Sequence, residues 1–255
     1  MDRDALCEEV RLPGSGTAAW CFRPRGEPGA GLLMLPVTAG DYEVECGLAR
    51  WLAGRGFTTL LVGRRAEWLV PGRMPAEIAA QAAGAYKDAS LGIDWLLGPG
   101  GIDPHRIGLV GISLGAYLGS VVAGTDPRVR ASVLLLGGAD LAEALLTADD
   151  GFIDEWRASV AARLGVRPDE LGPALRAAID PVDNLAPAAG IDPATTLMVL
   201  AAFDRVVVPR LGRLLWEAAH RPRRLLLPCG HYSAALFLPV IRLATAQWLE
   251  RLLRA

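Results

Sequence analysis

Lysine is almost absent from this chain. Its 255 residues hold 26 lysines and arginines together, and Lys87 is the only lysine among them. An imine-forming enzyme would have to use that one side chain, and no G-x-x-x-x-G-K pattern precedes it, which excludes a P-loop. A basic excess is missing too, because 26 cations and 28 acids leave a formal net charge of −2. Binding to nucleic acid is therefore not expected.

Cysteine and histidine are also scarce, with 4 cysteines and 3 histidines in the whole chain. No two cysteines form C-x-x-C. Cys229 stands two positions before His231, but no second pair of ligands completes a zinc site. We therefore expect no metal and no cofactor, and four free thiols of the kind found in a reducing cytosol.

Long hydrophobic runs and a leader segment are missing as well. The chain begins Met1-Asp2-Arg3-Asp4, without the apolar stretch of a signal peptide. The most apolar segment, 107–124, is interrupted by glycines and serines, so it divides better into a strand, a turn and a helix than into a membrane span. We expect a cytoplasmic protein that does not associate with membranes. Whether it forms a homodimer stays open at this stage.

Apolar residues make up 52% of the chain, enough for a large core. Short β-type runs alternate with longer helical patterns, which indicates an α/β fold: a mostly parallel sheet with helices on both faces. Two runs near the start, 6–12 and 17–22, flank a Pro-Gly-Ser-Gly turn and predict an antiparallel hairpin at one sheet edge. Further strands are expected at 31–37, 57–62, 106–110, 129–136, 195–202 and 223–227. Helices are expected at 41–54, 76–97, 114–123, 210–219 and 234–253.

The alternation is interrupted between residues 140 and 192. This segment has three helical patterns and no β-type run, and it holds nine acids against four arginines between Glu143 and Asp183. We interpret it as a small helical cap, inserted into a single domain that covers residues 1–255. The helical patterns lie at 141–146, 153–164 and 168–179.

A G-x-S-x-G motif follows the strand at 106–110. In Gly111-Ile112-Ser113-Leu114-Gly115 the serine stands between an apolar strand and a helical pattern, the setting that a nucleophile elbow requires. The sharp turn needs small residues on both sides of the serine, because the strand and the helix approach each other there. Ser113 is therefore the candidate nucleophile, at a helix N-terminus that favours negative charge.

A serine nucleophile needs a base, and in this fold the chain order is serine, acid, histidine. His105 begins a strand and His220 ends a helix, which suits structural roles. His231 follows the last strand, at the sheet edge where such folds bind ligands. His231 is therefore the candidate base.

The acid should end the preceding strand. Asp204 is the only acid in the loop after 195–202 and precedes His231 by 27 residues, enough for a helix and a strand. Asp192 lies at the wrong end of that strand. Asp140, which follows an earlier strand, is the fallback acid, although it also suits a helix cap.

An oxyanion hole needs two backbone N–H donors. The residue after the nucleophile, Leu114, is expected to supply one. The loop after 31–37 is expected to supply the other. Pro36 has no N–H, so Val37 or Thr38 is the candidate there.

These residues resemble the α/β-hydrolase superfamily, in particular its dienelactone-hydrolase and prolyl-oligopeptidase-like serine esterases. The likeness runs from residue 31 to residue 253 and includes the elbow, Phe203-Asp204 and Gly230-His231-Tyr232. The resemblance implies a serine hydrolase with catalytic Ser113, Asp204 and His231. The nucleophile is serine where dienelactone hydrolases use cysteine, so that substrate is not implied. The usual His-Gly-Gly signature of the oxyanion loop is also absent.

The simplest function is a carboxylesterase that acts on a small-molecule ester or acyl substrate through an acyl-enzyme. Thioesterases, peptidases or amidases and acyltransferases use the same triad, and a non-catalytic binding protein of this fold is the alternative from a different class. Phe152 and Trp156 are candidates for the wall of an apolar acyl pocket. Arg64 and Arg65 follow a strand and are candidates for binding a substrate carboxylate.

Overall fold

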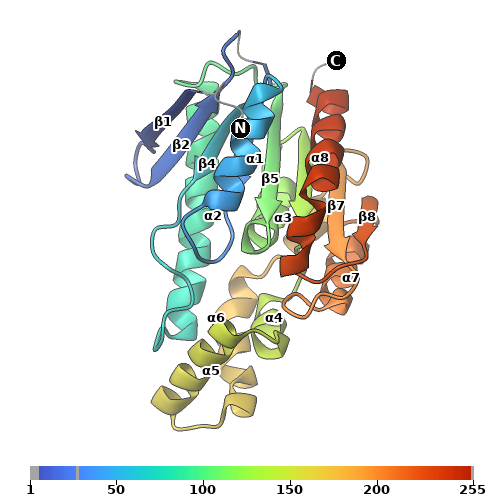
Figure 1. The fold of residues 1–255 in the computed structure, drawn as a ribbon. Helices are drawn as coiled ribbons and strands as arrows, with labels where there is room; N and C mark the ends of the chain where they lie inside the picture. Colours follow the sequence, from blue (N-terminus) through green and yellow to red (C-terminus); the bar gives the residue numbers. More distant parts are fainter. Residues whose placement is uncertain (1–5, 27–28, 254–255) are drawn as a thin grey trace.

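A computed structural model describes residues 6–26 and 29–253, so Met1–Asp4, on which the signal-peptide expectation rests, lies outside the described part. Figure 1 shows one twisted sheet with helices on both sides. The strands are β1 (Leu6–Arg11), β2 (Ala18–Arg23), β3 (Gly31–Leu35), β4 (Thr58–Val62), β5 (Ile107–Ile112), β6 (Ala131–Leu135), β7 (Thr196–Ala201) and β8 (Arg223–Leu227).

The strand order in the sheet is β1-β2-β4-β3-β5-β6-β7-β8. β1 pairs antiparallel with β2, and β2 pairs antiparallel with β4. All the other pairings are parallel. The predicted mostly parallel sheet with an N-terminal antiparallel hairpin is thereby confirmed.

The helices cover both faces of the sheet and explain why its central strands are buried throughout. Helices α1 (Glu43–Gly54) and α8 (Leu238–Leu253) lie on one face. Helices α2 (Pro75–Leu97), α3 (Leu114–Thr125) and α7 (Pro209–Ala218) lie on the other. Within the described ranges, every helix is too short or too polar to cross a membrane.

Three helices connect β6 to β7: α4 (Leu141–Thr147), α5 (Gly151–Leu164) and α6 (Gly172–Ile179). In Figure 1 they gather beyond the carboxyl ends of the parallel strands. The single helix expected at 168–179 is instead a 3₁₀ turn, Pro168–Glu170, followed by α6. Pro173 accounts for the break, because proline is tolerated in the first turn of a helix and not in its interior.

The last helix also begins later than the sequence pattern indicates. The expected span was 234–253, whereas a 3₁₀ turn covers Tyr232–Phe237 and α8 starts at Leu238. Pro239 is the physical reason, since its missing N–H and fixed φ place it at a helix start.

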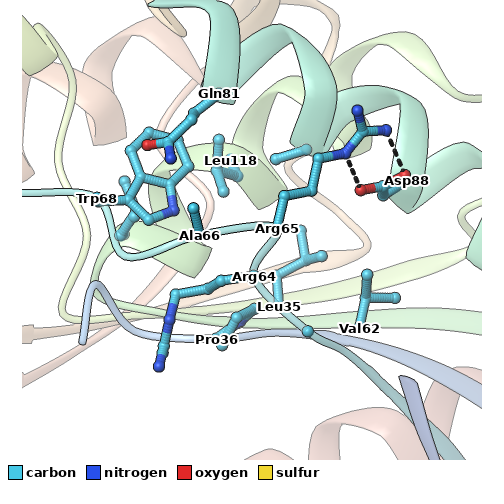
Figure 2. A pocket seen from close by; sticks show the side chains of 13 residues that line it. Leu35, Pro36, Val62, Arg64, Arg65, Ala66, Trp68, Gln81, Asp88 and Leu118 are labelled. Carbon is cyan, nitrogen blue, oxygen red and sulfur yellow. Dashed lines mark hydrogen bonds and ion pairs between the residues drawn. The ribbon is translucent and has the colours of Figure 1, made fainter. Parts of the chain in front are cut away.

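The carboxylate of Asp88 on helix α2 is buried and pairs with Arg65, which follows β4 (Figure 2). Asp88 is 1% exposed and accepts hydrogen bonds from Arg65 Nε at 2.6 Å and Arg65 Nη2 at 2.7 Å. The Thr17 hydroxyl donates a third, at 2.9 Å. Burial by itself would raise the pKa of Asp88, but hydrogen bonds from Arg65, Ser15 and Thr17 outweigh it and hold the pKa below its ordinary value.

Replacing Asp88 by alanine is expected to lower the free energy of unfolding by about 2 kcal/mol near neutral pH, because Arg65 and Thr17 lose a buried acceptor. The depressed pKa sets the pH dependence. The carboxylate stabilises the fold above its unfolded pKa of about 3.9 and ceases to do so as pH falls through the lower folded value. Urea unfolding at about pH 7 and about pH 3 should therefore show the gap between wild type and variant shrinking at acid pH.

The matched control is Asp94→Ala, on the same helix. The Asp94 carboxylate is 57% exposed and pairs with Arg128, so its loss should cost at most about 1 kcal/mol. Equal losses for the two variants at neutral pH would contradict a special contribution from the buried Asp88 carboxylate.

Candidate active site

Ser113 stands at the turn between β5 and α3, in a backbone conformation that few non-glycine residues adopt (φ 55°, ψ −114°). Its flanking glycines are required by close packing. A Cβ on Gly111 would lie 2.2 Å from the Gly115 carbonyl oxygen, and one on Gly115 would lie 2.1 Å from the Leu35 carbonyl oxygen. The G-x-S-x-G pattern thus lets β3, β5 and α3 approach one another around the half-buried Ser113.

The structure brings Ser113, His231 and Asp204 together, although they are far apart in the sequence. His231 Nε2 lies 3.1 Å from Ser113 Oγ, and His231 Nδ1 lies 2.7 Å from Asp204 Oδ2. A carboxylate only accepts hydrogen bonds, so Nδ1 carries the imidazole proton and Nε2 is free to accept from the hydroxyl. The side chains of His231 and Asp204 are only 9% and 3% exposed.

The loop after β7 holds Asp204 in place. Its second oxygen, Oδ1, accepts the backbone N–H groups of Val206 and Val207, each at 2.9 Å. One carboxylate oxygen therefore faces the imidazole, while the other is anchored to its own loop. This arrangement orients the imidazole ring toward Ser113.

The other candidates of the triad lie elsewhere. Asp140 caps α4 by accepting the Glu143 N–H at 2.9 Å, and it faces Arg176 across an ion pair of 3.2 Å. His220 is exposed, with Nε2 beside the Ala189 carbonyl oxygen at 3.0 Å. His105 is exposed before β5. None of these three side chains bonds to Ser113 in the part of the chain that the structure describes.

The three proposed oxyanion donors differ in their bonding. The Val37 N–H donates to Glu45 Oε1 at 2.9 Å, so it is already engaged within the protein. Among the described residues, no acceptor takes the N–H of Leu114 or of Thr38. Leu114 begins α3, and the first N–H groups of a helix have no partner within it.

Two apolar cavities meet at Ser113. The larger, about 510 Å³, lies toward α1 and α8, and the smaller, about 70 Å³, lies toward α2 and α4. The larger is lined by Val44, Leu48, Phe152, Leu238 and Ile241, among others. The smaller is lined by Trp68, Ile78, Leu141 and Leu145, among others. Both cavities share Thr38, Leu69, Ile153 and Val206 with Ser113.

The two aromatic residues predicted to line an acyl pocket have different surroundings. Phe152 lines the larger cavity and is 42% exposed. Trp156 lines neither cavity: it is fully buried, and its Nε1 donates to the Arg73 carbonyl oxygen at 2.9 Å. Trp156 lies on the buried side of α5 and packs that helix against the rest of the core.

The two arginines predicted to bind a substrate carboxylate are engaged within the protein. Figure 2 shows Arg65 reaching Asp88, whereas Arg64 points in another direction. Arg64 donates to the carbonyl oxygens of Val37, at 3.0 Å, and Gly40. Neither arginine lines the two cavities beside Ser113, so their positions do not support the predicted contact with substrate.

Sequence reasoning missed Glu45. The residue is 1% exposed and lies on the buried face of α1 together with Leu48 and Leu52. The signal was present, since Glu45 precedes Leu48 by three residues and Leu52 by seven, and this spacing places it on the apolar face of the helix where a core residue is expected. Only the folded chain shows that this acid meets the loop after β3.

The chain was compared with protein-family models, with curated proteins and with solved structures. No protein-family model matches the chain. An uncharacterized protein of Mycobacterium tuberculosis is 35% identical over 115 residues, which span 45% of this chain and 38% of that relative. The puromycin-hydrolyzing peptidase of Mycobacterium tuberculosis has a TM-score of 0.71 at 18% identity, covering 98% of this chain and 39% of that one.

An esterase of Pyrococcus furiosus has a TM-score of 0.66 at 13% identity, and the match covers 98% of this chain and 93% of that one. At such low sequence identity, the two structural likenesses show a shared fold.

Proposed function

We propose that this chain, which has the α/β-hydrolase fold, is a serine hydrolase that cleaves carboxylic esters. The observation that carries the proposal is the unbroken hydrogen-bond chain from Ser113 through His231 to the buried Asp204. A serine is a weak nucleophile unless a base takes its proton, and this chain of contacts supplies the base and the group that orients it.

In the proposed reaction, Ser113 Oγ attacks the ester carbonyl carbon while His231 Nε2 takes the hydroxyl proton. Asp204 stabilises the imidazolium that forms. The carbonyl oxygen becomes an oxyanion beside the Leu114 N–H, at the start of α3. The ester C–O bond then breaks and the alcohol leaves with the proton from His231. A water molecule then attacks the acyl-enzyme by the same steps, with His231 as the base. This releases the carboxylic acid and regenerates Ser113.

The surroundings of Ser113 support an uncharged substrate. Both cavities are mostly apolar, and no arginine or lysine lines either of them. An anionic group near the scissile ester would lose water without gaining a cationic partner. We assign the substrate to neutral, apolar esters. In this proposal the chain is a single domain, and α4, α5 and α6, within residues 140–192, act as a cap. Residues of α4 and α5 wall the smaller cavity.

A panel of activated substrates tests the proposal. We expect the purified chain to hydrolyse 4-nitrophenyl butyrate with a kcat/KM at least about tenfold above that for the anionic 4-nitrophenyl hemisuccinate, since a buried charge without a partner costs at least about 1.4 kcal/mol. A thioester and an aminoacyl anilide, included in the same panel, distinguish ester from thioester and amide cleavage. Absence of turnover on every ester, or a preference for the anionic ester, would contradict the proposal.

A further inference from the structure

The loop after β3 is held at Val37 from two directions. The Val37 N–H donates to Glu45 Oε1 at 2.9 Å, and the Val37 carbonyl oxygen accepts from Arg64 Nη1 at 3.0 Å. Both partners come from neighbouring elements: Glu45 lies on α1, and Arg64 follows β4. Both polar groups of this residue are therefore fixed by side chains, and the peptide planes on either side of it are restrained.

Arg64 itself is firmly placed. Its side chain is 4% exposed, and Nη2 reaches the Gly40 carbonyl oxygen, so a single guanidinium connects both ends of the 37–40 loop. The group lies over the Tyr42 ring, 4.2 Å from its centroid, and the Tyr42 hydroxyl accepts the Arg64 backbone N–H at 2.8 Å. A planar guanidinium with several donors suits this task better than an ammonium, because it can bond two carbonyl oxygens while stacking on a ring.

These contacts determine where the next N–H points. The Val37–Thr38 peptide is trans, and in a trans peptide the carbonyl and the following N–H point to opposite sides. With the Val37 carbonyl turned toward Arg64, the Thr38 N–H is turned away from it. Thr38 lines both cavities beside Ser113, whereas Arg64 and Glu45 line neither.

We propose that Arg64 and Glu45 are positioning residues that aim the Thr38 N–H at the oxyanion and make it the second donor of the oxyanion hole. This inference rests on the proposed function, because it assigns a part in the same reaction. Val37 is excluded as the donor, since its own N–H is bonded to Glu45. Neither positioning residue touches the substrate; both act through the peptide between Val37 and Thr38.

The size of the effect follows from the chemistry. Removal of one oxyanion donor lowers kcat by about 10²–10³-fold in serine hydrolases. Loosening the loop misaligns the donor without deleting it, so we expect Arg64→Gln and Glu45→Leu to lower kcat by about 10–100-fold. The KM for a neutral ester should change by less than about threefold, because the oxyanion forms only in the transition state.

The experiment measures kcat and KM with 4-nitrophenyl butyrate, and the affinity for an apolar trifluoromethyl ketone, which forms a charged tetrahedral adduct with serine. Arg64→Gln and Glu45→Leu should lose ketone affinity by about the same factor as kcat, since both report on the oxyanion. The matched controls are Arg50→Gln and Glu43→Gln, exposed residues on α1, which should keep both values within about twofold.

The outcomes separate the two claims. Folded Arg64→Gln and Glu45→Leu proteins with unchanged kcat and unchanged ketone affinity would overturn the inference, and so would a loss confined to KM. If Arg64→Gln does not fold, Arg64→Lys replaces it in the same test. Lysine keeps the charge but cannot bond the Val37 and Gly40 carbonyl oxygens together, so the same losses of kcat and ketone affinity are expected. A wild type that neither hydrolyses the ester nor binds the ketone overturns the proposed function as well.

Discussion

Replacing Ser113 by alanine is expected to lower kcat/KM for 4-nitrophenyl butyrate by at least about 10⁴-fold, because no other group can form the acyl-enzyme. The same change should abolish covalent labelling by a fluorophosphonate probe, which reacts with activated serines. The fold should persist, since alanine occupies the turn with no more bulk than serine and Ser113 Oγ bonds only to His231 among the described residues. Mass spectrometry of the labelled wild type should place the adduct on Ser113.

Ser90→Ala is the control for this prediction. Ser90 lies on α2, where its hydroxyl accepts a hydrogen bond from Arg128 at 2.9 Å, remote from the two cavities. It should retain both labelling and turnover. Wild-type protein that is folded but never labelled would favour a binding protein without turnover. Full activity in Ser113→Ala would mean that another residue is the nucleophile.

Replacing Asp204 by asparagine is expected to lower kcat by about 10⁴-fold, with a much smaller change in KM. The asparagine NH₂ can donate to His231 Nδ1, which moves the imidazole proton to Nε2. The ring then cannot accept the proton of Ser113, although it stays in position. Steady-state kinetics with the neutral ester measure the loss, and circular dichroism checks that the fold is intact.

Asp140→Asn decides between the two acids that the sequence offers. In the structure Asp140 caps α4 and pairs with Arg176, so the variant should lose stability and keep kcat within about threefold. If Asp140→Asn lost activity as severely as Asp204→Asn, the assignment of the acid would be wrong.

The strands could be predicted because the sheet is covered on both faces. Strands β3 to β7 are apolar at almost every position, and such runs are distinct from the helical patterns between them. The starts of α6 and α8 lie a few residues later than the sequence pattern predicts. Pro173 and Pro239 are the reason, since each proline is tolerated only in the first turn of its helix.

Contacts of charged side chains could not be predicted in the same way. Arg64 and Arg65 are adjacent in the sequence and identical in type, yet one holds the loop after β3 and the other pairs with Asp88 on α2. Trp156 has the size and polarity of a pocket residue but lies on the core-facing side of α5. Which neighbour a long side chain meets depends on how separate elements pack.

The sequence by itself determined the elbow and the order of the candidate triad. The glycines on either side of Ser113 are required because a Cβ at either position would collide with neighbouring backbone atoms. Asp204 and His231 each follow a strand that the apolar pattern predicts. Tertiary structure alone decided which N–H remains available beside Ser113. Glu45, Arg64 and Val37 come from three segments that meet only when α1 and β4 pack around β3, and a hydrogen bond forms only at that contact.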